Sequence, residues 1–215
     1  MLRPVISNDL FTICFVIGLI LIAITKVLFA KRFNDFVFVL GNSKYLKIYS
    51  KDQKFFDFFD AMLFGNFVFS ITIFGILSFT ELYSSVEISL ILMLKLFLAV
   101  AIFIIMKILV ERLIGSVFDI DFLIDNYLFQ KISYKNFVGI LLLPLNALLI
   151  YSFQGSPIII YCIVAIILLV FFIGLLTTLK VYQNLIKQNL FYFILYLCAL
   201  EIAPYVIIFS IIIDF

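Results

Sequence analysis

Long apolar stretches recur along this chain, and they restrict its fold more than any other feature of the sequence. An α-helix needs about 20 apolar residues to cross the hydrocarbon core of a bilayer. Such stretches occur six times, at residues 10–30, 61–80, 88–110, 137–153, 158–179 and 191–213. The chain is 66% hydrophobic and 13% charged, whereas soluble domains carry about 25% charged residues. The sequence therefore predicts an all-α, polytopic membrane helix bundle of about six transmembrane helices, forming one integral membrane domain over residues 1–215.

Two segments between the spans mix lysines with aromatic residues, which favours amphipathic helices lying in the headgroup layer. The first covers residues 31–60 and the second covers residues 118–136. In the first segment, the stretch DQKFFDFFD spaces phenylalanines along one helical face. The residues expected to contact lipid there are Lys44, Lys47, Lys51, Lys54, Phe55, Phe56 and Phe59. Docking of a cytoplasmic partner on this surface is an alternative that is compatible with lipid contact.

Basic residues are confined to alternate connections between the spans. The connections after spans one, three and five carry six, three and two basic residues, and those after spans two and four carry none. The positive-inside rule then places the basic connections in the cytoplasm. With six spans, both termini are predicted to lie outside the cytoplasm.

The last span carries a carboxylate, Glu201, near its middle. A carboxylate at the bilayer centre costs about 2.5–3.5 kcal/mol on insertion scales, so we expect it to meet a polar group of protein or water. Pro204 follows three residues later and leaves the carbonyl of Leu200 without its usual helical donor. Two interpretations stay open: a contact that only fixes helix packing, and a proton- or ion-linked functional site.

Four other residues interrupt the apolar spans. Lys95 is the basic residue expected nearest to the depth of Glu201, so an ion pair between them is a candidate. Lys107 lies close to the inner boundary and is expected to extend its ammonium group to the membrane surface. Pro144 frees the carbonyl of Ile140 within the fourth span, and Asn146 beside it is expected to hydrogen-bond a neighbouring group.

The residue types that are missing exclude several kinds of chemistry. The chain contains no His and no Trp, which removes imidazole metal sites and His-based acid–base catalysis. Its three cysteines, Cys14, Cys162 and Cys198, all lie inside apolar spans, where they are expected to act as small hydrophobic residues. There is no P-loop and no nucleotide fingerprint. We therefore expect no enzymatic activity, no cofactor, no metal and no nucleic-acid partner.

Two stretches carry a family resemblance. They are YLCALEIAP at Tyr196–Pro204, preceded by FYFI, and DNYLFQKISYKNFVGILLLPLNALLIY at Asp125–Tyr151. They resemble an uncharacterised multi-spanning membrane protein family of Bacteroidota, catalogued as a domain of unknown function, with a C-terminal YLCALEIxP signature. The Cys, Glu and Pro of that signature fall on Cys198, Glu201 and Pro204. The resemblance implies an inner-membrane location in a diderm bacterium, and it implies no activity and no ligand.

These observations favour a non-enzymatic subunit or accessory protein of an inner-membrane envelope assembly, for example in protein export or secretion. Its expected partners are the lipid bilayer and other membrane protein subunits. The alternative is a small ion- or proton-coupled transporter that uses Glu201 and Lys95 at a midplane site. An intramembrane enzyme acting on lipid is the weakest hypothesis, because one buried carboxylate without a nucleophile and a base is too little for catalysis.

Overall fold

The computed structural model describes residues 9–41, 44–50, 57–82, 89–118, 120–152 and 156–181. The elements in these ranges are all α-helices: α1 (Asp9–Leu28), α2 (Ala30–Val37), α3 (Lys44–Tyr49), α4 (Phe58–Leu82), α5 (Leu90–Val117), α6 (Asp121–Tyr151) and α7 (Pro157–Val181). Five of them, α1, α4, α5, α6 and α7, are long and apolar enough to cross a membrane. The prediction of an all-α, membrane-embedded bundle is confirmed for these residues, and the predicted sixth span at 191–213 lies outside them.

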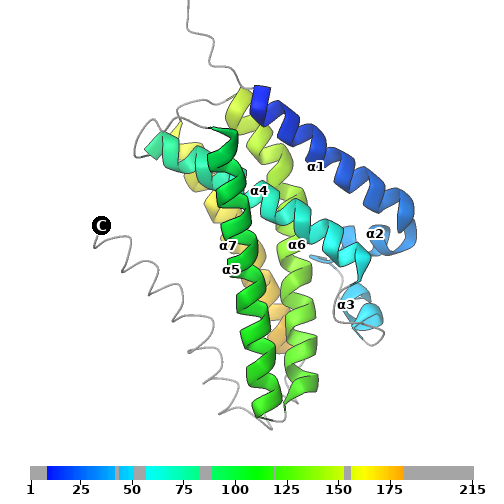
Figure 1. Cartoon of the computed structure of the whole chain (residues 1–215). Helices are drawn as coiled ribbons and strands as arrows, with labels where there is room; N and C mark the ends of the chain where they lie inside the picture. Colours follow the sequence, from blue (N-terminus) through cyan, green and yellow to red (C-terminus); the bar gives the residue numbers. More distant parts are fainter. Residues whose placement is uncertain are drawn as a thin grey trace, which may run out of the picture.

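Helix α6 is the centre of the arrangement. It contacts α1, α2, α4, α5 and α7, and its contact with α4 is the most extensive one among the described helices. Figure 1 shows α5 and α6 running beside each other to one end of the bundle, with α1, α2 and α3 gathered along one side. We call the end at which α1, α5 and α7 finish, and at which α4 and α6 begin, the basic end of the bundle.

Glycines set how closely the long helices approach α6. The tightest contact is at Gly139 of α6, where an added Cβ would lie 2.5 Å from the Cα of Phe67 in α4. The other three long helices also meet α6 at a glycine: Gly18 of α1 at Leu143, Gly115 of α5 at Ile124, and Gly174 of α7 at Tyr134. Small residues let helix backbones come close in a membrane, where van der Waals packing takes over from the hydrophobic effect.

A buried hydrogen bond reinforces the contact between α4 and α6. Asn146 Nδ2 donates to the backbone carbonyl oxygen of Ser70 at 2.9 Å, and both residues are buried. Interhelical hydrogen bonds of side chains in membranes contribute about 0.6 kcal/mol on average. Asn146 therefore meets α4 across the central contact. Pro144, two residues earlier, is exposed, and α6 continues through it as one helix.

The predicted interfacial helix at residues 118–136 is wrong in the structure. α5 continues to Val117, and α6 is one continuous helix from Asp121 to Tyr151. The reason is that the polar side chains in the first half of α6 are turned into the bundle instead of toward water. The buried polar residues of this half are Asn126, Gln130, Ser133, Lys135 and Asn136.

The described parts of the segment 31–60, which is predicted to lie flat in the headgroup layer, also pack into the bundle. They form the short helices α2 and α3, and Phe59 belongs to the first turn of α4. The ring of Phe36 makes edge contacts with Tyr45 at 5.4 Å and with Phe59 at 5.8 Å between centroids. Phe59 has no exposed surface, so the predicted lipid contact is wrong for this residue: other aromatic rings cover it.

Replacing Gly139 with Ala tests the central contact. The new methyl group would collide with the backbone of α4, which cannot rotate away as a side chain can, so we expect a loss of about 1–3 kcal/mol or more. Unfolding can be followed with a thiol-reactive dye that reports exposure of the buried Cys14 in a Cys162→Ser/Cys198→Ser background. Gly65→Ala in α4 is the matched control, because a Cβ there has nothing within 4 Å. Equal stability of the two variants would contradict the close approach.

Candidate functional site

Charged side chains are buried between α5 and α6 near the basic end of the bundle. Glu111 of α5 has no exposed surface. Its Oε1 lies 2.7 Å from Nζ of Lys131 in α6 and 4.0 Å from Nζ of Lys107, one turn earlier on α5. We call Lys107, Glu111 and Lys131 the charge cluster. Because buried charges are costly unless they are paired and hydrogen-bonded, these contacts join α5 to α6 at a defined register.

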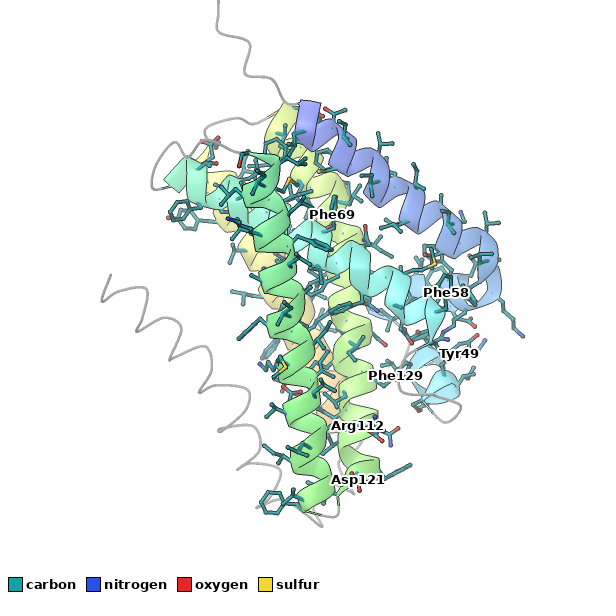
Figure 2. The ribbon with its side chains drawn as sticks, in the orientation of Figure 1. Tyr49, Phe58, Phe69, Arg112, Asp121 and Phe129 are labelled. Atoms are coloured by element: carbon teal, nitrogen blue, oxygen red, sulfur yellow. The ribbon has the colours of Figure 1, made fainter. Side chains whose placement is uncertain are left out.

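The local sequence explains why the charge cluster forms at this place. Lys107 and Glu111 are four residues apart, which puts them on one face of α5. Gly115, one turn further, packs closely against Ile124 and brings α6 near this face. A second pair, Arg112 and Asp125, joins the same two helices at 3.3 Å, but it is largely exposed. Figure 2 shows Arg112 on this stretch, with Asp121 at the start of α6 below it.

Helix α6 contributes a polar stripe to this region. Tyr127, Gln130, Lys131 and Tyr134 are spaced i, i+3, i+4 and i+7, the spacing that places residues along one helical face. The ammonium group of Lys131 lies 5.5 Å from the ring centroid of Tyr127, and the ring of Tyr134 packs on Gly174 of α7. Tyr127, Gln130 and Tyr134 are buried. We call these four residues the α6 stripe.

A second charged group fixes the connection between α1 and α4. Arg32 of α2 donates to Asp57 at 2.9 Å and to Asp60 at 2.8 Å, so its two terminal nitrogens bridge both carboxylates. Its guanidinium carbon lies 4.6 Å from the ring centroid of Phe59 and 5.2 Å from that of Tyr49. A planar guanidinium is suited to bidentate pairing and aromatic stacking at once. Arg32 therefore holds α2 and α3 against the start of α4.

Tyr45 of α3 connects this charged group to α6. Its ring stacks on Phe129 of α6 with 5.8 Å between centroids. Figure 2 shows Tyr49, the neighbour of Tyr45 one turn on, on the side of the bundle that faces the α6 region around Phe129. Burial raises the pKa of Tyr45 above its ordinary value, Asp60 raises it further, and Arg32 lowers it. Tyr45 is therefore a neutral packing residue at physiological pH.

The structure does not bring the predicted intramembrane residues together. Lys95 and Pro144 are exposed, whereas Asn146 is buried against α4. Lys107 is buried and faces Glu111, so the prediction that it reaches the membrane surface is wrong. The prediction fails because α5 extends past the expected boundary, which places Lys107 opposite α6.

Of the other predicted residues, only two lie in the described ranges: Lys44 and Lys47, which are exposed on α3. The rest lie outside these ranges, and they are Lys51, Lys54, Phe55, Phe56, Glu201 and Pro204. The candidate pair of Lys95 with Glu201 therefore stays a prediction. In the ranges that are described, no group of three or more His, Cys, Asp or Glu side chains is arranged to hold a metal ion.

Sequence reasoning missed Glu111 and the Arg32 bridge. A signal for Glu111 was present, because it follows Lys107 by one helical turn and completes an i,i+4 pair. The bridge from Arg32 to Asp57 and Asp60 joins residues that are 25 and 28 positions apart. No local spacing indicates such a pair, since it depends on how the chain folds back after α1.

Removing the charge of Glu111 should destabilise the bundle. Glu111→Gln leaves two buried lysines facing a neutral group, and breaking a buried pair typically costs about 3–5 kcal/mol. Asp125→Asn is the control, because its pair with Arg112 is exposed and should contribute only about 0–1 kcal/mol. Chemical unfolding in detergent measures both variants. If Glu111→Gln were as mild as Asp125→Asn, the charge cluster would not hold α5 to α6.

Replacing Arg32 with Lys keeps the charge and removes the bidentate geometry. We expect the variant to lose about 1.5–3 kcal/mol, the usual contribution of hydrogen bonds to charged groups, because one ammonium group cannot bridge both carboxylates and stack on Phe59. Lys31→Arg, at the exposed neighbouring position, should stay within about 0.5 kcal/mol of the wild type. Wild-type stability of Arg32→Lys in the same dye assay would show that charge alone suffices.

Comparison with known proteins adds a family and nothing further. No curated protein and no solved structure matches the chain. The profile of a family described as a domain of unknown function (DUF4271) matches residues 11–212. That range includes α1 from its third residue, all of the other long helices and both charged groups, so the match concerns the whole bundle. This chain belongs to the DUF4271 family.

Proposed function

We propose that this protein is a non-enzymatic integral subunit or accessory protein of an inner-membrane assembly in a bacterial envelope, in a process such as protein export. The observation that carries the proposal is that the polar side chains make contacts between helices. The charge cluster, the Arg32 bridge and the Asn146 hydrogen bond all connect one helix to another. They act as fixed joints of a scaffold.

The distribution of charge supports an orientation for this scaffold. Exposed lysines at the basic end include Lys26, Lys31 and Lys47. The positive-inside rule favours the cytoplasm for this end of the bundle. With six spans, both chain termini would then be periplasmic. In this orientation the charge cluster and the Arg32 bridge stiffen the cytoplasmic side.

The outward surfaces of the bundle suit contact with other membrane helices. α5 and α7 each expose a long row of apolar side chains: Leu94, Leu98, Ile102, Ile105, Met106 and Leu109 on α5, and Tyr161, Leu168, Leu169, Phe172 and Leu175 on α7. Two apolar grooves of about 400 and 390 Å³ lie beside the first half of α5. These grooves are too small for a whole helix, which is about 10–12 Å across. They are large enough to accept side chains of a neighbouring helix.

The transport alternative receives less support from the geometry. Discontinuous helices and convergent polar groups near the midplane are typical of carriers. Here α6 is continuous through Pro144, Lys95 is exposed on α5, and the amide of Asn146 is hydrogen-bonded to the carbonyl of Ser70. These three residues do not converge on one site, so the scaffold role is the one we propose.

Isolation from native membranes in mild detergent tests the proposal. We expect a discrete complex larger than the 24.9 kDa chain, containing further membrane proteins identified by mass spectrometry and cross-linked to α5 or α7. The double variant Leu98→Ala/Ile102→Ala should retain fewer of them, because it removes apolar contact from the exposed face of α5. Val27→Ala, at an exposed position of α1, is the control. Recovery of the wild type only as a monomer, with no cross-linked protein, would contradict the proposal.

A further inference from the structure

Two neighbouring side chains of the α6 stripe bury polar atoms that have no partner. Gln130 is 1% exposed and Tyr134 is 2% exposed. Among the described residues, neither amide atom of Gln130 has a hydrogen-bond partner, and the hydroxyl of Tyr134 has none. Buried polar groups in native proteins are almost always hydrogen-bonded to protein or to ordered water. Three unpartnered atoms within one helical turn therefore require an explanation.

The position of the two side chains in the bundle narrows that explanation. They are four residues apart, so they lie one above the other on the same face of α6. Tyr134 packs directly against Gly174 of α7, where an added Cβ would lie 2.8 Å from its ring. Gln130 is one turn closer to the basic end, next to Lys131 of the charge cluster. The Tyr134 ring therefore lies between α6 and α7, and Gln130 follows it on the same face of α6 toward the buried charges.

The opposite helix offers an acceptor at the matching level. Thr177 lies one turn nearer to the basic end than Gly174 on α7, and its hydroxyl donates to the carbonyl oxygen of Ile173 at 2.9 Å. This bond uses the proton of the hydroxyl and leaves its oxygen lone pairs able to accept. The antiparallel register of α6 and α7 thus places Thr177 across from the turn that carries Gln130.

We propose that Gln130 and Tyr134 form a binding site for ordered water inside the bundle, between α6 and α7. A buried water needs two to four polar partners. The carboxamide of Gln130 supplies two N–H donors and an acceptor oxygen, and the hydroxyl of Tyr134 supplies one O–H donor and an acceptor oxygen. Water at this place also serves the charge cluster. A buried ion pair is tolerated only when further hydrogen bonds satisfy its remaining polar atoms, and water next to Lys131 lowers that cost.

This site goes beyond a scaffold function, because it makes the interior of one end of the bundle wet. Phe15 of α1 and Phe74 of α4 are also buried, each 7% exposed, but they belong to the apolar core of the bundle. An apolar interior of that kind stays dry. The two regions therefore differ in hydration although both are buried, and this difference can be measured.

Synchrotron hydroxyl-radical footprinting of the full chain in lipid nanodiscs tests the site, since radicals arise from bound water itself and modify side chains that touch it. We expect modification of Tyr134 despite its burial, while Phe15 and Phe74 stay unmodified. If Tyr134 is as unreactive as those two phenylalanines, the site is dry and the proposal is overturned. This measurement needs no substitution, so it does not depend on the folding of a variant.

A substitution then tests the role of the amide. Gln130→Met keeps the length of the side chain and removes both hydrogen-bonding atoms, so modification of Tyr134 should fall to the level of Phe15. Ile132→Met, at a buried apolar position of the same helix, is the matched control and should leave Tyr134 as reactive as in the wild type. Unchanged modification in Gln130→Met would overturn the proposal. A rise in unfolding temperature for Gln130→Met would do the same, because replacing a dry unpartnered amide by an apolar group is stabilising.

Discussion

The close approach of α4 to α6 at Gly139 is the constraint on which the rest of the structure depends. The backbone of Phe67 occupies the space that any side chain at position 139 would need. With α4 held this near, Asn146 reaches the Ser70 carbonyl, and α6 becomes the helix that α1, α5 and α7 also contact. Lipid gives helices no hydrophobic reason to associate, so such tight backbone contacts and interhelical hydrogen bonds carry the association.

The polar half of α6 follows from this central position. A helix surrounded by other helices can carry Lys131, Lys135 and Asn136 at membrane depth or close to it, because neighbouring helices cover most of the surface of these side chains. The same residues then need partners, and Glu111 of α5 provides one of them. The chain thus separates two tasks: apolar rows on α5 and α7 face outward, and the interhelical ion pairs of the described residues lie near the basic end. The proposed scaffold role would use this division between outward apolar surfaces and inward polar contacts.

Much of the fold could be predicted from hydropathy, and the site mostly could not. The long apolar stretches identify α1, α4, α5 and α7 because each is apolar on every side. α6 was divided into an interfacial helix and a short span because hydropathy cannot tell a polar residue facing water from one facing another helix. Lys107 was misplaced for the same reason, and Phe59 was misplaced because hydropathy cannot tell an aromatic ring facing lipid from one facing other rings. A need for a polar partner could be stated for Asn146 from its residue type, but its partner Ser70 is 76 residues away, and only the folded bundle reveals it.

Solid-state NMR of the protein in lipid bilayers tests the central contact most directly. The structure places the Cα atoms of Gly139 and Phe67 within about 4 Å of each other, given the length of a Cα–Cβ bond. With glycine and phenylalanine Cα atoms labelled by ¹³C, the account predicts a strong Gly139–Phe67 cross-peak at short mixing times, and its loss in Phe67→Leu. Absence of that cross-peak in the wild-type protein, with sequential pairs such as Phe64–Gly65 visible, would contradict the account.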